Sequence, residues 1–166
     1  MPQSLPDMLA SGRRPQPGHR PEQEARRTLR RTTVALSGVP LFAGFSKRHL
    51  SHLAGAAEEV RFEAGERIVE EGNPGETLFV LLEGQVKVFR GGGLRTRLVP
   101  GDFFGEVSVL DGGPRTATIV AETPVAALRL FRRTVLELVA SEPQLALLLL
   151  EGIARRIREI DRSLTR

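Results

Sequence analysis

The chain has 166 residues, which suits one domain with a hydrophobic core, and it has no cysteine, which excludes disulfides, thiolate metal sites and a thiol nucleophile. Its formal net charge is +4, and composition alone does not indicate a nucleic-acid partner. The N-terminus lacks the apolar stretch of a signal peptide, and the longest apolar run, Leu145 to Leu150, is too short to cross a bilayer, so we expect a soluble, cytoplasmic protein.

Residues 1–28 are predicted to form a disordered basic arm. They are rich in proline, glutamine, glycine and arginine and poor in large apolar side chains. Such a segment buries too little surface to offset the entropy that it loses on ordering. The arm either binds something anionic or serves as a solubilising tail, and the globular domain is expected to span residues 29–166.

Two short helices joined by a turn are predicted in the next segment. Apolar residues recur at mixed spacing over residues 29–57, and the pattern is interrupted by Gly38, Pro40 and Gly44. Ser46 is positioned to cap the second helix, because its hydroxyl can accept a hydrogen bond from a free backbone amide.

From Glu58 onward the hydrophobic pattern changes to a period of two, which indicates strands. The predicted strand segments include TLFVLLE, QVKVFR, LRTRLV, ATIVAE and VAALRL, and glycine or proline residues separate them. Strands that recur every eight to twelve residues are typical of a small antiparallel barrel or roll.

Helices are predicted again at the end of the chain. Phe131 to Ala140 is expected to form one helix, and Ser141 to cap a long final helix that occupies residues 143–165. Apolar residues recur at steps of three and four along that helix, beyond the end of the predicted domain. A partner helix from a second copy is the simple explanation, and folding back on the same domain is the alternative. The expected fold is therefore α+β: a small, jelly-roll-like antiparallel β-roll with N-terminal helices, a short helix before the last strands and a long C-terminal helix.

The segment Phe104 to Thr118, FGEVSVLDGGPRTAT, carries the candidate ligand site. Gly105 lets the backbone approach a ligand closely, and Glu106 to Leu110 is long enough for one helical turn with free amides at its start. Asp111 to Pro114 then forms a tight turn, which brings Arg115 next to that helix end. The segment is typical of a cradle for a small anion.

Three side chains of this segment suit a sugar phosphate. Arg115 can bind phosphate oxygens, Thr116 can donate a hydroxyl, and Glu106 can accept from a ribose. The residues alone leave an alternative open, in which Glu106 and Arg115 pair with each other and only stabilise the turn.

The same segment resembles the phosphate-binding cassette of the cyclic nucleotide-binding domain family. The family pattern is F-G-E-(L/I/M)-(A/S)-L, a short turn, and P-R-(T/S/A)-A-(T/S)-(V/I), and this chain has FGEVSVL, DGG and PRTATI. The flanking segments PLFAGFS, FEAGERIVEEGNPGETLFVLLEGQVKV and LVPGDFFGE also resemble the family. The resemblance covers roughly Val34 to Leu164.

The resemblance implies a role for each cassette residue. Glu106 would bind the ribose 2′-hydroxyl and Arg115 would neutralise the cyclic phosphate. The rest of the cradle would comprise Gly105, Val107, Ser108 through its backbone amide, and Thr116. A hydroxyl directly after the cassette arginine occurs in family members that accept cGMP as well as cAMP, so either nucleotide is an expected ligand.

The residues that would contact the base are less well matched. The stretch Gly152 to Asp161, GIARRIREID, resembles the long helix of the catabolite activator proteins, including the paired arginines Arg155 and Arg156. Those proteins read adenine with two hydroxyl residues, where this chain has Ile160 and Asp161. We expect Arg156 to stack on the base and Asp161 to accept from an exocyclic amine, and the alternative is that both are solvated.

We therefore predict a sensor module that binds cAMP or cGMP without a metal ion. It would signal to an unidentified effector through movement of its C-terminal helix and would form a homodimer through that helix. No catalytic residue set is apparent, so we expect no enzyme activity, and nucleic acid is not an expected partner. One alternative is a ligand-free dimerisation scaffold. The other is the regulatory half of a transcription factor or channel, since relatives built for transcription continue into a helix-turn-helix and this chain stops at Arg166.

Overall fold

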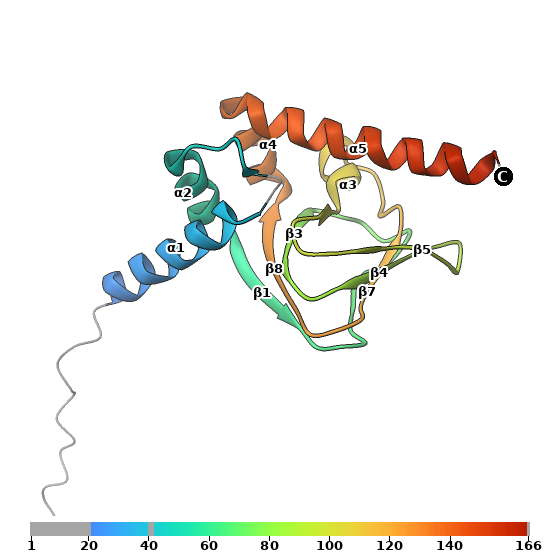
Figure 1. Cartoon of the computed structure of the whole chain (residues 1–166), viewed down its shortest axis with the longest axis horizontal. Helices are drawn as coiled ribbons and strands as arrows, with labels where there is room; N and C mark the ends of the chain where they lie inside the picture. The colour runs from blue at the N-terminus through green and yellow to red at the C-terminus, as the bar shows by residue number, and fades with distance from the viewer. Residues whose placement is uncertain (1–20, 40–41, 166) are drawn as a thin grey trace, which may run out of the picture.

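The computed structural model describes residues 21–39 and 42–165 and consists of a β-roll flanked by helices (Figure 1). The strands are β1 (Glu58–Phe62), β2 (Arg67–Val69), β3 (Thr77–Glu83), β4 (Val86–Arg90), β5 (Gly93–Leu98), β6 (Phe103–Phe104), β7 (Thr118–Ala121) and β8 (Val125–Phe131). The helices are α1 (Pro21–Ser37), α2 (Lys47–Ala56), α3 (Glu106–Asp111), α4 (Arg132–Ser141) and α5 (Pro143–Leu164).

The strands form two four-stranded antiparallel sheets. Their orders are β1-β8-β3-β6 and β2-β7-β4-β5. In the first sheet β3 pairs with β8, so that Leu78 lies opposite Leu130 and Val80 opposite Leu128. The predicted α+β class and antiparallel roll are confirmed.

The strand β3 is apolar on consecutive residues because both of its faces are covered. Leu78 and Val80 are buried on the face that packs against the helices, whereas Phe79 and Leu81 are buried between the two sheets. The core therefore has two parts, one inside the roll and one between the roll and the helices. The second part holds α4 and the start of α5 against the first sheet.

The helix α1 begins earlier than the sequence indicates. We predicted disorder up to residue 28, and that boundary is wrong, because the structure is helical from Pro21 onward. Thr32, Thr33 and Leu36 are buried on one side of α1, and a helix fixed by such contacts extends toward its N-terminus at little cost. A proline in the first turn also suits a helix start. The remainder of the predicted arm, residues 1–20, lies outside the described residues.

The two predicted helix caps have different outcomes. The Ser46 hydroxyl accepts a hydrogen bond from the His49 amide at 3.2 Å, which confirms the cap of α2. The cap predicted at Ser141 is wrong, since Ser141 is the last residue of α4 and its hydroxyl donates to the Leu138 carbonyl at 3.3 Å. The position before α5 is occupied by Glu142, whose side chain makes no capping hydrogen bond.

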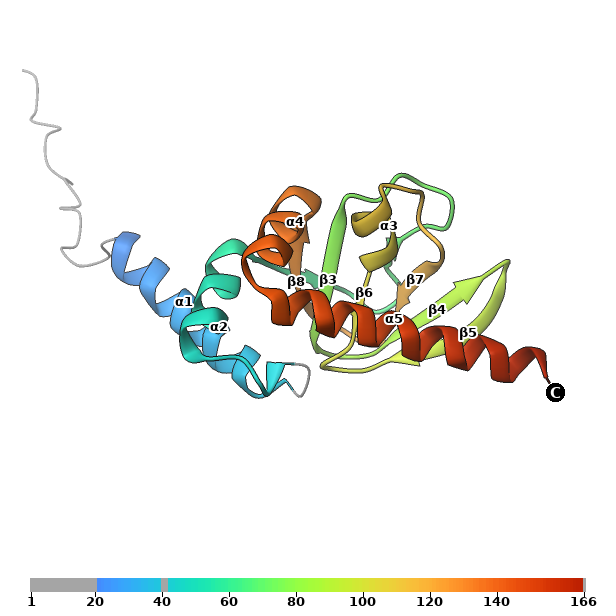
Figure 2. The ribbon, with the colours of Figure 1, turned by 90° about the horizontal axis from the view of Figure 1, so that it is seen from above.

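The helix α5 crosses the roll and continues past it (Figure 2). Leu145, Leu149 and Gly152 are buried in its first half. In its second half Ile157 is 54% exposed and Leu164 is 79% exposed. None of the helices in the described chain is both long and apolar enough to cross a membrane.

Candidate functional site

The cassette helix α3 starts at a glycine that no other residue can replace without strain. Gly105 has a φ of +88°, and a Cβ built there would lie 2.5 Å from the Thr77 carbonyl oxygen and 2.6 Å from Nη1 of Arg115. The absent side chain therefore leaves room for the arginine beside the start of α3. The sequence prediction that Gly105 permits a close approach is consistent with this geometry.

Arg115 is buried beside α3, and its guanidinium donates hydrogen bonds to Thr77. Its residue is 7% exposed. Nη1 donates to the Thr77 carbonyl at 2.8 Å and Nη2 donates to the Thr77 hydroxyl at 2.7 Å. Among the ion pairs of the described residues, none joins Arg115 to an acid, so the turn-stabilising pair with Glu106 does not form in this structure.

The environment of Arg115 disfavours an isolated cation. Burial lowers the pKa of the guanidinium below its ordinary value, and the nearby charge of Glu106 raises it again in part. An arginine stays protonated at neutral pH even so. The site thus holds a partly desolvated positive charge, which an incoming anion would stabilise.

A loop between β2 and β3 holds Arg115 in place. The Arg115 amide donates to the Asn73 carbonyl at 2.8 Å, and the Gly72 amide donates to the Arg115 carbonyl at 2.9 Å. A Cβ at Gly75 would lie 2.5 Å from Nε of Arg115, so this position also needs a glycine. Gly75 and Thr77 both contact Arg115, and the sequence analysis identified neither of them as a site residue.

Glu106 lies in the same site and contacts the C-terminal helix. It is 3% exposed, and its carboxylate pairs with the guanidinium of Arg156. Arg156 also donates to the Phe103 carbonyl, and its Cζ lies 5.1 Å from the centre of the Phe103 ring. The structure therefore brings Arg156 to the cassette, as a residue of α5 that contacts both β6 and α3.

The other residues predicted for the site differ in their burial and contacts. Ser108 is buried and its hydroxyl donates to the Pro114 carbonyl at 3.0 Å, which ties α3 to the turn before Arg115. Val107 is half-buried in the first turn of α3, and Thr116 is exposed. Asp161 is exposed one turn beyond Arg156, and no hydrogen bond or ion pair of the described residues joins its side chain to α3.

Two further contacts connect the helices that follow the roll to other elements, one to the cassette and one to α2. Nε of Arg132, the first residue of α4, donates to the Val109 carbonyl of α3 at 2.9 Å. At the junction of α4 and α5, the Glu142 carboxylate lies 3.0 Å from Nε2 of His49 and 3.7 Å from Nδ1 of His52, both on α2. The C-terminal helices are thus attached to the cassette at one end and to α2 at the other.

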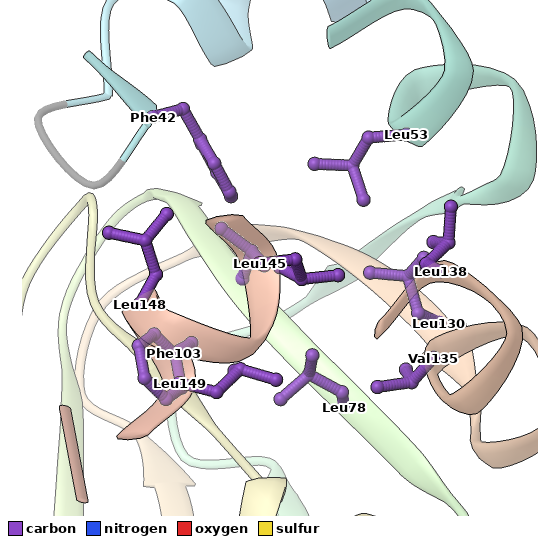
Figure 3. Close-up of a pocket in the computed structure, with 11 residues that line it drawn as sticks. Phe42, Leu53, Leu78, Phe103, Leu130, Val135, Leu138, Leu145, Leu148 and Leu149 are labelled. Carbon is purple, nitrogen blue, oxygen red and sulfur yellow. The ribbon is translucent and has the colours of Figure 1, made fainter. Parts of the chain in front are cut away.

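Between these contacts lies an apolar cavity of about 10 Å³ (Figure 3). Figure 3 shows Leu78, Phe103, Val135, Leu138 and Leu145 pointing toward it from the sheet, α4 and α5. A space of that size holds at most one water molecule, so it is no ligand site. Within the described residues, no group of three or more His, Asp or Glu side chains is placed to hold a metal ion.

The fold is a β-roll, and its candidate site is a buried arginine beside a short helix that starts at a glycine, which suits a small anion. The family model of the cyclic nucleotide-binding domain matches residues 59–142 of the sequence, and the chain belongs to that family. The matched range includes the whole cassette and its supporting loop.

Three relatives illustrate the range of the family. A CRP-like cAMP-activated global transcriptional regulator of Mycobacterium tuberculosis is 31% identical over 134 residues, which is 78% of this chain and 60% of that protein. The crystal structure of the catabolite activator protein of Thermus thermophilus has a TM-score of 0.69 and 35% identity, over 76% of this chain and 62% of that one. The regulatory subunit of a cAMP-independent protein kinase A from Trypanosoma brucei has a TM-score of 0.70 and 26% identity, over 86% of this chain and 50% of that one.

Proposed function

We propose that this chain is a regulatory sensor that binds cAMP or cGMP at the cassette. The observation that carries the proposal is the buried guanidinium of Arg115, which has no carboxylate partner among the described residues and is enclosed by Gly75 and Gly105. A cyclic phosphate would supply the missing negative charge. A cAMP-activated relative supports the same class of ligand.

Both halves of a ribose phosphate have a partner in the site. The hydrogen bonds to Thr77 and Gly105 use at most three of the five N–H groups of Arg115. The remaining N–H groups can donate to phosphate oxygens. Arg156 bonds to one carboxylate oxygen of Glu106, Oε1. The other oxygen of Glu106 is left to accept from the ribose 2′-hydroxyl, because a carboxylate can accept several hydrogen bonds.

The signal would pass from α3 to the C-terminal helices. A ligand that draws α3 toward Arg115 also moves the Val109 carbonyl, to which Arg132 of α4 is bonded. The apolar contacts of Leu138 and Leu145 would then transmit the displacement from α4 to α5. The ligand can change the position of α5 only by as much as its affinities for the two positions differ.

Pairing of α5 with the same helix of a second copy completes the proposal. Leu150, Ile157 and Leu164 are exposed at intervals of seven residues, and Ile160 adds a fourth apolar position. Such spacing favours a two-stranded coiled coil. The sensor would then act as a homodimer on an effector that remains to be identified.

Isothermal titration calorimetry with cAMP, cGMP and the linear monophosphates AMP and GMP tests the proposal. We expect binding of at least one cyclic nucleotide, and weaker binding of the corresponding linear one, because its second phosphate charge and open ring fit the cradle less well. Absence of heat with both cyclic nucleotides, for a folded protein, would contradict the proposed function.

A ligand-free dimerisation scaffold is the second candidate. It is supported by the contact of Arg156 with Glu106, which uses part of the acidic group, and by the relative described as belonging to a cAMP-independent kinase. The chain spans 60% of the length of the M. tuberculosis regulator. The same titration separates the scaffold from the sensor.

A further inference from the structure

We propose that a groove between α1 and the first sheet binds an acidic peptide segment of a partner protein. The groove has about 730 Å³ of free space. It is lined by α1 on one side and by residues of β1, β3 and β8 on the other. None of the cassette residues lines it, so the inference does not depend on nucleotide binding.

Arginines form one wall of the groove. Arg26, Arg27, Arg30 and Arg31 all line it, and all four are exposed. Residues three and four apart lie on the same side of a helix, so the four guanidinium groups form a single stripe along about two turns of α1. Among the described residues, none of the four takes part in an ion pair.

The acids on the opposite wall are already neutralised in part. Arg61 lies 2.9 Å from the carboxylate of Glu59 and 3.9 Å from that of Glu83. The arginines of α1 therefore determine the charge that the groove presents. Guanidinium groups bind carboxylates through two parallel hydrogen bonds, which suits the side chains of aspartate and glutamate.

Each wall also contributes an apolar side chain. Val34 lines the groove and is 70% exposed, and Leu82 lines it from β3 and is half-buried. An exposed valine beside an arginine stripe gives an aliphatic side chain a place to pack. The matching occupant is therefore a peptide in which acidic residues alternate with aliphatic ones.

Other anionic partners fit the groove less well. Among the described residues that line it, none is aromatic and able to stack on a nucleic-acid base, and Glu59 and Glu83 would lie beside a polyphosphate backbone. A flat lipid surface does not enter a concave groove. The first twenty residues of the chain contain one acid, Asp7, against Arg13, Arg14 and Arg20, so they are not complementary to it either.

The test uses fluorescence anisotropy with the full chain and a labelled peptide in which glutamates alternate with leucines and alanines. We expect binding that weakens with added salt, and about tenfold weaker binding for Arg26→Gln/Arg30→Gln, which removes two charge-assisted contacts. The matched control is Arg48→Gln/Arg95→Gln, which lowers the net charge equally at two exposed arginines outside the groove. The control should bind like the unaltered chain.

Three results would overturn the inference. The first is an equal peptide affinity for the two double variants. The second is tighter binding of a single-stranded oligonucleotide or of phosphatidylserine vesicles than of the peptide. The third is a second copy of the chain in the groove, seen as an oligomer that Arg26→Gln/Arg30→Gln dissociates. Calorimetry with cAMP on the same variants serves as a separate readout. The cAMP titration tests the sensor proposal, and its result has no bearing on peptide binding in the groove.

Discussion

Arg156 contacts Glu106 through its guanidinium although the two residues lie fifty positions apart in the sequence. The contact joins α5 to α3 and places a residue of the C-terminal helix inside the cassette. A ligand that binds Glu106 therefore also affects the residue that attaches α5 to the roll.

The first prediction concerns this ion pair. Arg156→Gln should weaken cyclic nucleotide binding by about 1–2 kcal/mol, because Glu106 loses the partner that orients it and α5 loses a contact to the cassette. Calorimetry measures the change. The matched control is Arg155→Gln, an exposed neighbour on the same helix, which should bind normally. Tighter binding by Arg156→Gln would mean that Arg156 competes with the ligand, against this account.

The second prediction concerns the packing of α5 on the roll. A Cβ at Gly152 would collide with Cζ of the buried Phe103 ring, so Gly152→Ala should lower the free energy of unfolding by about 1–3 kcal/mol despite the better helix propensity of alanine. Amide hydrogen exchange should rise in the second half of α5. Gly55→Ala in α2 is the control, since the nearest atom would be 3.7 Å away. Equal unfolding midpoints for both variants would show that α5 does not pack as described.

The third prediction concerns the support of Arg115. Gly75→Ala should displace the guanidinium and weaken cyclic nucleotide binding by about 1–3 kcal/mol while the roll stays folded. Gly93→Ala is the control, because its Cβ would have no neighbour closer than 3.8 Å. If Gly75→Ala binds the cyclic nucleotide with unchanged affinity, the position of the Arg115 guanidinium does not determine binding, which would contradict this prediction.

The fourth prediction concerns the exposed stripe of α5. Ile157→Lys should dissociate the proposed homodimer, because it introduces a charge among apolar residues at the helix pair. Light scattering after size exclusion measures the mass. Glu159→Gln changes the net charge by the same amount off the stripe and should remain dimeric. A monomeric unaltered chain, or equal masses for both variants, would contradict the dimer.

Local sequence signals predicted most of the fold. Alternating apolar residues located the strands, and the steps of three and four located α5, because both patterns reflect which side chains face a core. The start of α1 was not predicted, since residues 21–28 are exposed and gain their helical order from contacts made further along, at Leu36 among others. The supposed cap at Ser141 was wrong because α4 continues through that residue.

The site was predictable only where its residues are close together in the sequence. The cassette provided Glu106 and Arg115 from one short segment. Thr77 and Gly75 lie about forty residues before Arg115 and come next to it through the pairing of distant segments, which a local pattern does not encode. Arg156 was expected as a base contact from the family resemblance alone, and the structure adds its pairing with Glu106.

Calorimetry of Arg115→Ala with the cyclic nucleotide that the unaltered chain binds is the most direct test of the central claim. We expect the affinity to fall by about 2–4 kcal/mol, roughly 30- to 1000-fold, for the loss of a charge-assisted contact in a buried site. The exposed Arg95→Ala is the control, and thermal unfolding checks that both variants fold. A folded Arg115→Ala protein with unchanged affinity would contradict the claim that this guanidinium binds the phosphate.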